Sequence, residues 1–148
     1  MGNSHEQLLQ AKKHIEENIG KIMRSSSLYS TAAWGNKNQA DFLNQVLIVE
    51  TSLNPAKILK SALAIEKKMG RIRTIKNAPR IIDIDILFFN SGIIESKNLT
   101  IPHPEIHNRR FVLTPLIELT PNFTHPLLKK TMQQLLIECK DELNVQKI

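Results

Sequence analysis

Two aspartates near the middle of the chain, Asp83 and Asp85, are the side chains best placed to do chemistry. They lie in the apolar run 81–89, where isoleucines occupy the alternate positions. Alternate side chains of a β-strand share a face, so both carboxylates should point the same way. Magnesium typically takes one or two carboxylates and completes its shell with water and substrate phosphates. The pattern predicts a magnesium site, with a solvated acidic face of an edge strand as the alternative.

Basic residues precede this acidic run at Arg71, Arg73, Lys76 and Arg80. Mg²⁺ together with Arg and Lys side chains can neutralise a polyphosphate during in-line transfer. The order of charges therefore favours a polyphosphate substrate, and ordinary surface charges are the alternative.

A second polar cluster follows between residues 100 and 111. His103 lies between two prolines, and Arg109, Arg110 and Phe111 come soon after it. The histidines at 103 and 107 lack a third ligand of suitable spacing, so zinc is not expected. Neither a G-x-x-x-x-G-K-[ST] loop nor a G-x-G-x-x-G fingerprint is present, so a glycine-cradled nucleotide is not expected either.

Composition indicates an ordinary globular protein and one domain spanning 1–148. The 148 residues are 41% hydrophobic and carry a net charge of +6, which suits an anionic partner. Aromatic residues make up 5% of the chain, which argues against a stacking surface for single-stranded nucleic acid. A single cysteine, Cys139, and the lack of a long apolar run favour a cytoplasmic protein with no membrane span.

The order of elements predicts an α+β fold, a mainly antiparallel sheet with helices on one face. Helices are expected from Ser4 to about Gly20, from Asn54–Pro55 to Gly70, and from a capping box that begins at Thr131. Strands are expected at 23–31, at 46–49 and at 81–89. The histidines at 5, 14 and 125 are interpreted as surface or capping residues.

Several of these motifs together resemble the 6-hydroxymethyl-7,8-dihydropterin pyrophosphokinases of folate biosynthesis. The segments that carry the resemblance, in the family's order along nearly the whole chain, are 26–31, 41–44, 78–87, 101–104, 108–113 and 115–116. The resemblance implies a ferredoxin-like fold and transfer of the β,γ-pyrophosphoryl unit of ATP to the pterin's hydroxymethyl oxygen, releasing AMP.

The resemblance also implies roles for particular residues. Asp83 and Asp85 would bind two Mg²⁺ ions, and Arg71 and Arg80 would stabilise charge from a catalytic loop. ATP would contact Glu66, Arg73, Ile86, Thr100, His103 and Arg109. The pterin would contact Thr31, Ala32, Trp34, Phe42, Asn44 and Phe111, with Asn44 on its polar edge and Phe111 stacked on its ring.

The sequence departs from the family pattern at three places. The loop before the aspartates has Lys76-Asn77-Ala78 where the family has an aromatic residue, and Leu63 stands for an adenine-side Gln. The family's first strand is expected to be missing, with a natural start upstream as one explanation.

The expected partners are ATP and the pterin alone, without nucleic acid or membrane, and the expected state is a monomer or weak dimer. Two alternative functions remain at this point. One is a D-x-D metal-dependent nuclease or nucleotidyltransferase, and the other is a ferredoxin-like nucleic-acid-binding module.

Overall fold

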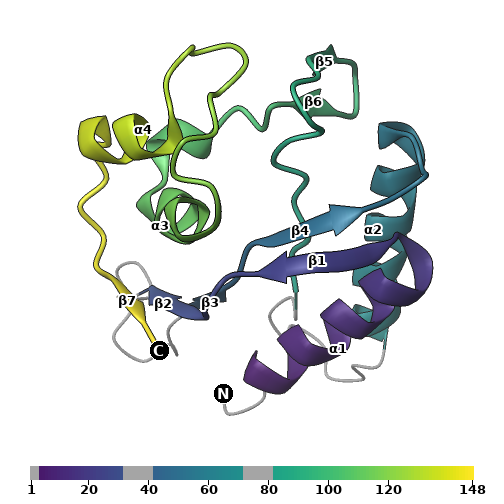
Figure 1. Ribbon diagram of the computed structural model, residues 1–148. Helices are drawn as coiled ribbons and strands as arrows, with labels where there is room; N and C mark the ends of the chain where they lie inside the picture. The colour runs from purple at the N-terminus through teal and green to yellow at the C-terminus, as the bar shows by residue number, and fades with distance from the viewer. Residues whose placement is uncertain (1–3, 32–41, 72–81) are drawn as a thin grey trace. The chain divides into compact units, whose positions relative to one another are not determined.

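The computed structural model describes residues 4–31, 42–71 and 82–148, which fall into two compact units (Figure 1). The first unit comprises Met1–Met23 and Ile48–Ile86, and the second comprises Arg24–Leu47 and Leu87–Ile148. The single domain expected from the sequence stays a prediction. Among the described residues, no helix is long and apolar enough to cross a membrane.

Two long helices form the core of the first unit. Helix α1 (Ser4–Asn18) packs against helix α2 (Pro55–Arg71). The buried residues of the two helices recur at helical spacing: Ala11, Ile15, Ile58, Ala62, Ile65 and Met69. Asn54 caps α2 by accepting a hydrogen bond from the Lys57 amide at 2.9 Å, which confirms the predicted start. Leu63, which stands in place of the family's adenine-side Gln, is 54% exposed on this helix.

The strand predicted at 23–31 is two strands in the structure. Strand β1 (Lys21–Ser25) pairs with β4 (Leu47–Glu50), whereas β2 (Tyr29–Thr31) belongs to another sheet. The break falls where the Ser26 amide donates to the carbonyl of Val46 and the Ser26 hydroxyl accepts from the Val46 amide. Serine side chains that bond to backbone groups compete with strand pairing, which explains the interruption.

The second unit contains a three-stranded antiparallel sheet in the order β3-β2-β7. Strand β3 (Phe42–Asn44) lies on one side of β2, and β7 (Val145–Lys147), near the end of the chain, lies on the other. Thr31 is opposite both Phe42 and Val145 in the register. A small antiparallel pair, β5 (Ile94–Glu95) with β6 (Thr100–Ile101), and the 3₁₀ turn η1 (Ile106–Asn108) complete the unit with two helices.

Helix α3 (Arg110–Leu119) contributes Leu113 and Leu116 to the core of the second unit, and the sequence did not predict it. Pro115 lies inside this helix. Because a proline there removes a backbone hydrogen bond, the sequence pattern indicated irregular structure for this segment. Burial overcomes that cost: the core combines Ile106, Leu113, Leu116, Met132 and Leu135. Tertiary packing thus decides the local structure at this point.

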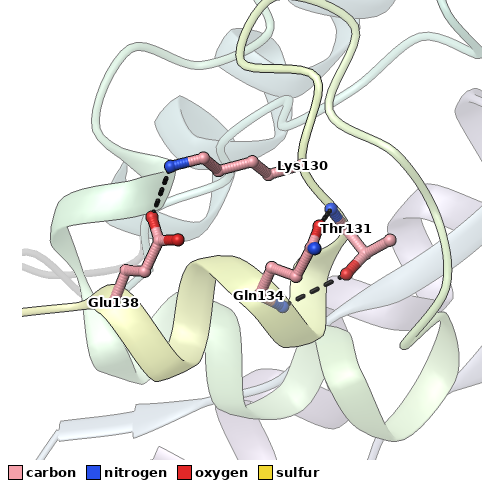
Figure 2. A network of polar contacts seen from close by, with 4 residues as sticks. All are labelled: Lys130, Thr131, Gln134 and Glu138. Atoms are coloured by element: carbon pink, nitrogen blue, oxygen red, sulfur yellow. Dashed lines mark hydrogen bonds and ion pairs between the residues drawn. The ribbon is translucent and has the colours of Figure 1, made fainter.

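Helix α4 (Met132–Glu138) begins as the sequence predicts (Figure 2). The Thr131 hydroxyl accepts a hydrogen bond from the Gln134 amide at 3.1 Å, and the Gln134 side chain accepts one from the Thr131 amide at 2.8 Å. Lys130 and Glu138 add an exposed ion pair at 2.6 Å. The capping box is therefore confirmed, and α4 packs against α3.

The strand predicted at 81–89 is wrong for the residues that the structure describes there. No strand is assigned at 82–88, although exposure still alternates from 82 to 86 as on an extended chain. Two backbone groups find other partners: the Ile84 amide donates to the side chain of Glu66, and the Leu87 carbonyl accepts from the His103 amide. In the described part of the chain, antiparallel pairing is confirmed for β2 with β3 and β7 and for β5 with β6.

Gly20 generates a prediction about the first unit. A Cβ at this position would clash with the backbone carbonyl of Glu50, whereas a Cβ at Gly70, on α2, meets nothing within 4 Å. We expect Gly20→Ala to lower the free energy of unfolding by about 1–3 kcal/mol. Gly70→Ala should leave it unchanged or raise it by up to about 1 kcal/mol. Urea unfolding of both variants tests this, and equal stability of the two would contradict it.

Candidate active site

The aspartate pair and helix α2 belong to the first unit. Asp83 and Asp85 are both exposed, and the residues that alternate with them are half-buried, so the two carboxylates face solvent together. Between them, the Ile84 amide donates to Glu66 Oε2 at 2.6 Å. This bond from α2 fixes the backbone that carries both aspartates. Glu66, predicted to contact ATP, therefore holds the aspartate segment in the structure.

The structure does not describe several of the predicted site residues, or describes only their backbone. Arg71 ends helix α2, and its side chain is not described. The positions of Ala32, Trp34, Arg73 and Arg80 lie outside the described residues. Ile86, predicted beside ATP, is half-buried at the end of the aspartate segment. The roles of these residues stay predictions.

His103 lies in the second unit, directly after β6 and Pro102. Its amide donates to the Leu87 carbonyl at 2.9 Å, and its Nδ1 accepts a hydrogen bond from the Glu105 amide at 3.1 Å. A neutral imidazole that accepts at Nδ1 carries its proton on Nε2. The ring is thereby set to donate from Nε2, which suits an anionic oxygen. Thr100, another predicted ATP contact, is half-buried in β6.

The start of helix α3 brings Arg109 and Phe111 together. Arg109 is the residue that caps the helix, and the Cζ atom of its guanidinium lies 5.8 Å from the centroid of the Phe111 ring. This distance is within the range of a cation–π contact. A predicted phosphate-binding cation and a predicted pterin-stacking ring therefore occupy one helical turn.

Strands β2 and β3 carry the remaining described residues predicted to contact the pterin. Thr31 is buried, Asn44 is half-buried, and Phe42 is 56% exposed. The Asn44 Nδ2 atom donates to the Thr31 hydroxyl at 3.5 Å, the outer limit of a hydrogen bond. Helix α3 packs against β2. Thr31 thus lies on the strand that contacts both α3, which carries Phe111, and β3, which carries Asn44.

Glu118 is a half-buried carboxylate that the sequence pattern did not single out. It accepts hydrogen bonds from the Ser27 amide and hydroxyl at 3.0–3.1 Å and from the Tyr29 hydroxyl at 2.7 Å. Burial alone would raise the pKa of the Glu118 carboxyl, but the hydrogen bonds from Tyr29 and Ser27 outweigh burial and lower it. Burial and the bond to Glu118 raise the pKa of Tyr29 to about 12. The available signal in the sequence was a single charged residue, Glu118, within the apolar segment 111–119.

His125, interpreted from the sequence as a surface or capping residue, is buried, with 3% of its surface exposed. Its Nδ1 accepts hydrogen bonds from the Leu127 and Leu128 amides, so it does cap a local turn. Its ring lies 5.6 Å from the ring of Phe88, edge to face. Burial, with a smaller effect of His107, lowers the pKa of His125. The capping interpretation is confirmed and the surface one is wrong, because the imidazole is buried and packs edge to face with Phe88.

The donor set of the aspartate pair fits a magnesium ion. Its ligands are oxygen atoms, and both carboxylates are exposed and so can share a metal with a phosphate ligand. Within residues 4–31, 42–71 and 82–148, no three His, Cys, Asp or Glu side chains gather as metal ligands.

A family model described as 7,8-dihydro-6-hydroxymethylpterin-pyrophosphokinase (HPPK) matches residues 1–121. The chain belongs to this family. The family resemblance noted in the sequence is thereby confirmed. The chain is 39% identical over 134 residues to the 2-amino-4-hydroxy-6-hydroxymethyldihydropteridine pyrophosphokinase of Aquifex aeolicus. This match covers 90% of the chain and 83% of the Aquifex protein. It is 40% identical over 121 residues to the protein of the same name from Synechocystis, covering 80% of the chain and 62% of that relative.

Longer relatives share the HPPK region as one part. The match to the folic acid synthesis protein fol1 of Schizosaccharomyces pombe covers 92% of the chain but 19% of that protein, at 38% identity. A crystal structure of HPPK-DHPS from Plasmodium falciparum matches with a TM-score of 0.74 and 20% identity, covering 92% of the chain and 42% of that structure's chain. The structural match shows the fold of the HPPK family.

The Glu118 cluster yields a prediction about pH and stability. The lowered pKa of Glu118 means that its contribution is present at neutral pH and is lost as pH falls below the unfolded value of about 4.5 and through the folded one. Glu118→Gln should lower the free energy of unfolding by about 1–3 kcal/mol at pH 7. It should also flatten the dependence of stability on pH below 5.

Urea unfolding between pH 3 and pH 7 measures both effects. Glu142→Gln, which changes an exposed carboxylate of the same unit, serves as the control. A Glu118→Gln protein with the stability and pH dependence of the wild type would show that the cluster does not stabilise the fold.

Proposed function

We propose that the described site residues carry out the reaction of the family, with the aspartate pair as its metal-binding centre. The chain is an ATP-dependent pyrophosphokinase of folate biosynthesis, as its family membership and its named relatives indicate. It transfers pyrophosphate from ATP to the hydroxymethyl group of 6-hydroxymethyl-7,8-dihydropterin and releases AMP. The observation that carries the proposed site is the exposed pair Asp83 and Asp85, anchored between them by Glu66.

Magnesium at Asp83 and Asp85, proposed as two ions, would neutralise charge on the triphosphate and so aid attack on the β-phosphorus. Arg71 and Arg80 are proposed to stabilise charge that develops on the transferred group. His103, with its Nδ1 already engaged by the Glu105 amide, would donate from Nε2 to a phosphate oxygen. Arg109 would add a positive charge on the ATP side. Positioning and charge neutralisation are the main requirements of this class of transfer.

The proposed pterin side uses the start of α3 and the β2–β3 pair. Phe111 offers a ring face for stacking, and Asn44 offers an amide that can both donate to and accept from the polar edge of a pterin. Thr31, Phe42, Ala32 and Trp34 are proposed to line the same side. Contact between α3 and β2 supports grouping Phe111 with Thr31 and Asn44.

The finer fold assignment is also a proposal. We propose a ferredoxin-like arrangement of the strands. It is supported by the antiparallel pairings of β2 with β3 and β7 and of β5 with β6. A cytoplasmic monomer or weak dimer without nucleic-acid partners fits the single cysteine and the low aromatic content. No observation favours a nuclease, a nucleotidyltransferase or a nucleic-acid-binding module.

Replacement of the aspartates tests the proposed site. Asp83→Asn and Asp85→Asn should each lower pterin-dependent AMP formation by roughly a hundredfold or more, because they remove charge that holds Mg²⁺ against the triphosphate. Glu95→Gln, at another exposed acidic position, should retain wild-type turnover. AMP is measured after incubation with ATP, Mg²⁺ and hydroxymethyl-dihydropterin.

Two outcomes of this assay would contradict the proposals. Release of ADP in place of AMP, or product formation without the pterin, would refute the reaction. Wild-type turnover in both aspartate variants, with the reaction itself intact, would refute only the metal assignment. Thermal unfolding of each variant checks that loss of activity does not come from loss of the fold.

A further inference from the structure

We propose that Asp141 is a positioning residue for the substrate-binding end of helix α3. The inference rests on the proposed function, because it assumes that Arg109 and Phe111 contact the substrates. Asp141 lies beyond residue 121, where the match to the family model ends. It belongs to the same unit as α3 and does not need to touch a substrate to act.

Asp141 contacts Arg110 through two different groups. Its Oδ2 accepts a hydrogen bond from the Arg110 amide at 3.0 Å, and its backbone carbonyl accepts one from the Arg110 Nε at 2.9 Å. Its other carboxylate oxygen, Oδ1, accepts from the Leu143 amide at 2.9 Å, which fixes the aspartate in a local turn. Both oxygen atoms of the carboxylate are therefore used, and the geometry is fixed from two sides.

Arg110 is the first residue of α3, between Arg109 and Phe111. The first amides of a helix have no partner within the helix, and the helix dipole favours a negative charge at this end. The side chain at the capping position, that of Arg109, makes no capping hydrogen bond. Asp141 supplies the missing acceptor and negative charge from 31 residues further along the chain. It thus substitutes for a local cap.

The segment that carries Asp141 also reaches the strand that holds Thr31. Four residues after Asp141, the chain enters β7, which pairs with β2 so that Val145 lies opposite Thr31 (Figure 1). The C-terminal segment is therefore hydrogen-bonded to the start of α3 through Asp141 and to β2 through β7. It ties together the two elements on which the proposed pterin contacts lie.

Removal of a helix cap that only stabilises the fold should lower the Tm alone. Removal of a cap that also positions substrate-binding groups should change the KM values as well. Thr131 provides the comparison within the same unit, because it caps α4, which carries no predicted site residue. Loss of either cap should destabilise the protein. Only loss of the Asp141 cap should alter the placement of Arg109 and Phe111.

The experiment compares Asp141→Ala, Asp141→Asn and Thr131→Ala in steady-state kinetics with ATP and hydroxymethyl-dihydropterin. We expect Asp141→Ala to lower kcat/KM for each substrate by roughly tenfold, mainly through a higher KM, because displaced binding groups lose contacts with both substrates. Asp141→Asn keeps an acceptor for the Arg110 amide and should recover most of this loss. Thr131→Ala should show a lower Tm with wild-type KM values.

Hydrogen exchange of the amides at 110–113 gives an independent readout, and it should accelerate in Asp141→Ala but not in Thr131→Ala. Wild-type KM values in Asp141→Ala, with Tm lowered as in Thr131→Ala, would overturn the inference while the proposed function stands. If Asp141→Ala does not fold, Asp141→Ser is measured in its place. Wild-type exchange rates at 110–113 together with wild-type KM values in Asp141→Ser would then overturn the inference. Absence of pterin-dependent AMP formation by the wild type would instead refute the proposed function, and the inference with it.

Discussion

The polar groups at both ends of helix α3 are partly withdrawn from water, and segments distant in sequence supply partners for them. At its start the Arg110 amide bonds to Asp141, and near its end Glu118 receives hydrogen bonds from Ser27 and Tyr29. An unpaired buried carboxylate or amide would cost several times the net gain of an average hydrogen bond. The helix also contains Pro115, which weakens it from within. Its stability therefore depends on the contacts of its surroundings, and the bonds from Arg110 to Asp141 are the ones proposed to place Arg109 and Phe111.

The sequence predicted best those features whose causes lie close together along the chain. The starts of α2 and α4 depend on Asn54 and on the Thr131–Gln134 pair, each within three residues of its partner, and both are confirmed. Helix α3, Glu118 and the burial of His125 were missed because their causes are long-range. Glu118 is 91 positions from Ser27, and no local pattern contains that information. Pro115 and His125 even carry local signals that favour the opposite conclusion.

In the aspartate segment the predicted strand is wrong, but the predicted alternation of exposed and half-buried side chains is observed. Alternation of Asp and Ile predicted a strand with both carboxylates on one side. The described residues 82–88 form no assigned strand, yet Asp83 and Asp85 are exposed and the residues between and beside them are half-buried. Extended backbone is sufficient to produce this alternation. The hydrogen bond from Ile84 to Glu66 replaces one that a neighbouring strand would provide. The chemistry inferred from the pattern therefore depends on the extended conformation and does not require the sheet.

Family motifs identify side chains that meet a substrate, because their chemistry is tied to residue type. Residues that hold those side chains in place act through backbone groups, and a backbone amide is the same in every residue. The bond from the Arg110 amide to Asp141 and the bond from the Ile84 amide to Glu66 are both of this kind. Asp141 even lies outside the part of the chain that the family model matches. A site of this type is thus completed by residues whose positions become evident only once the backbone hydrogen bonds are assigned.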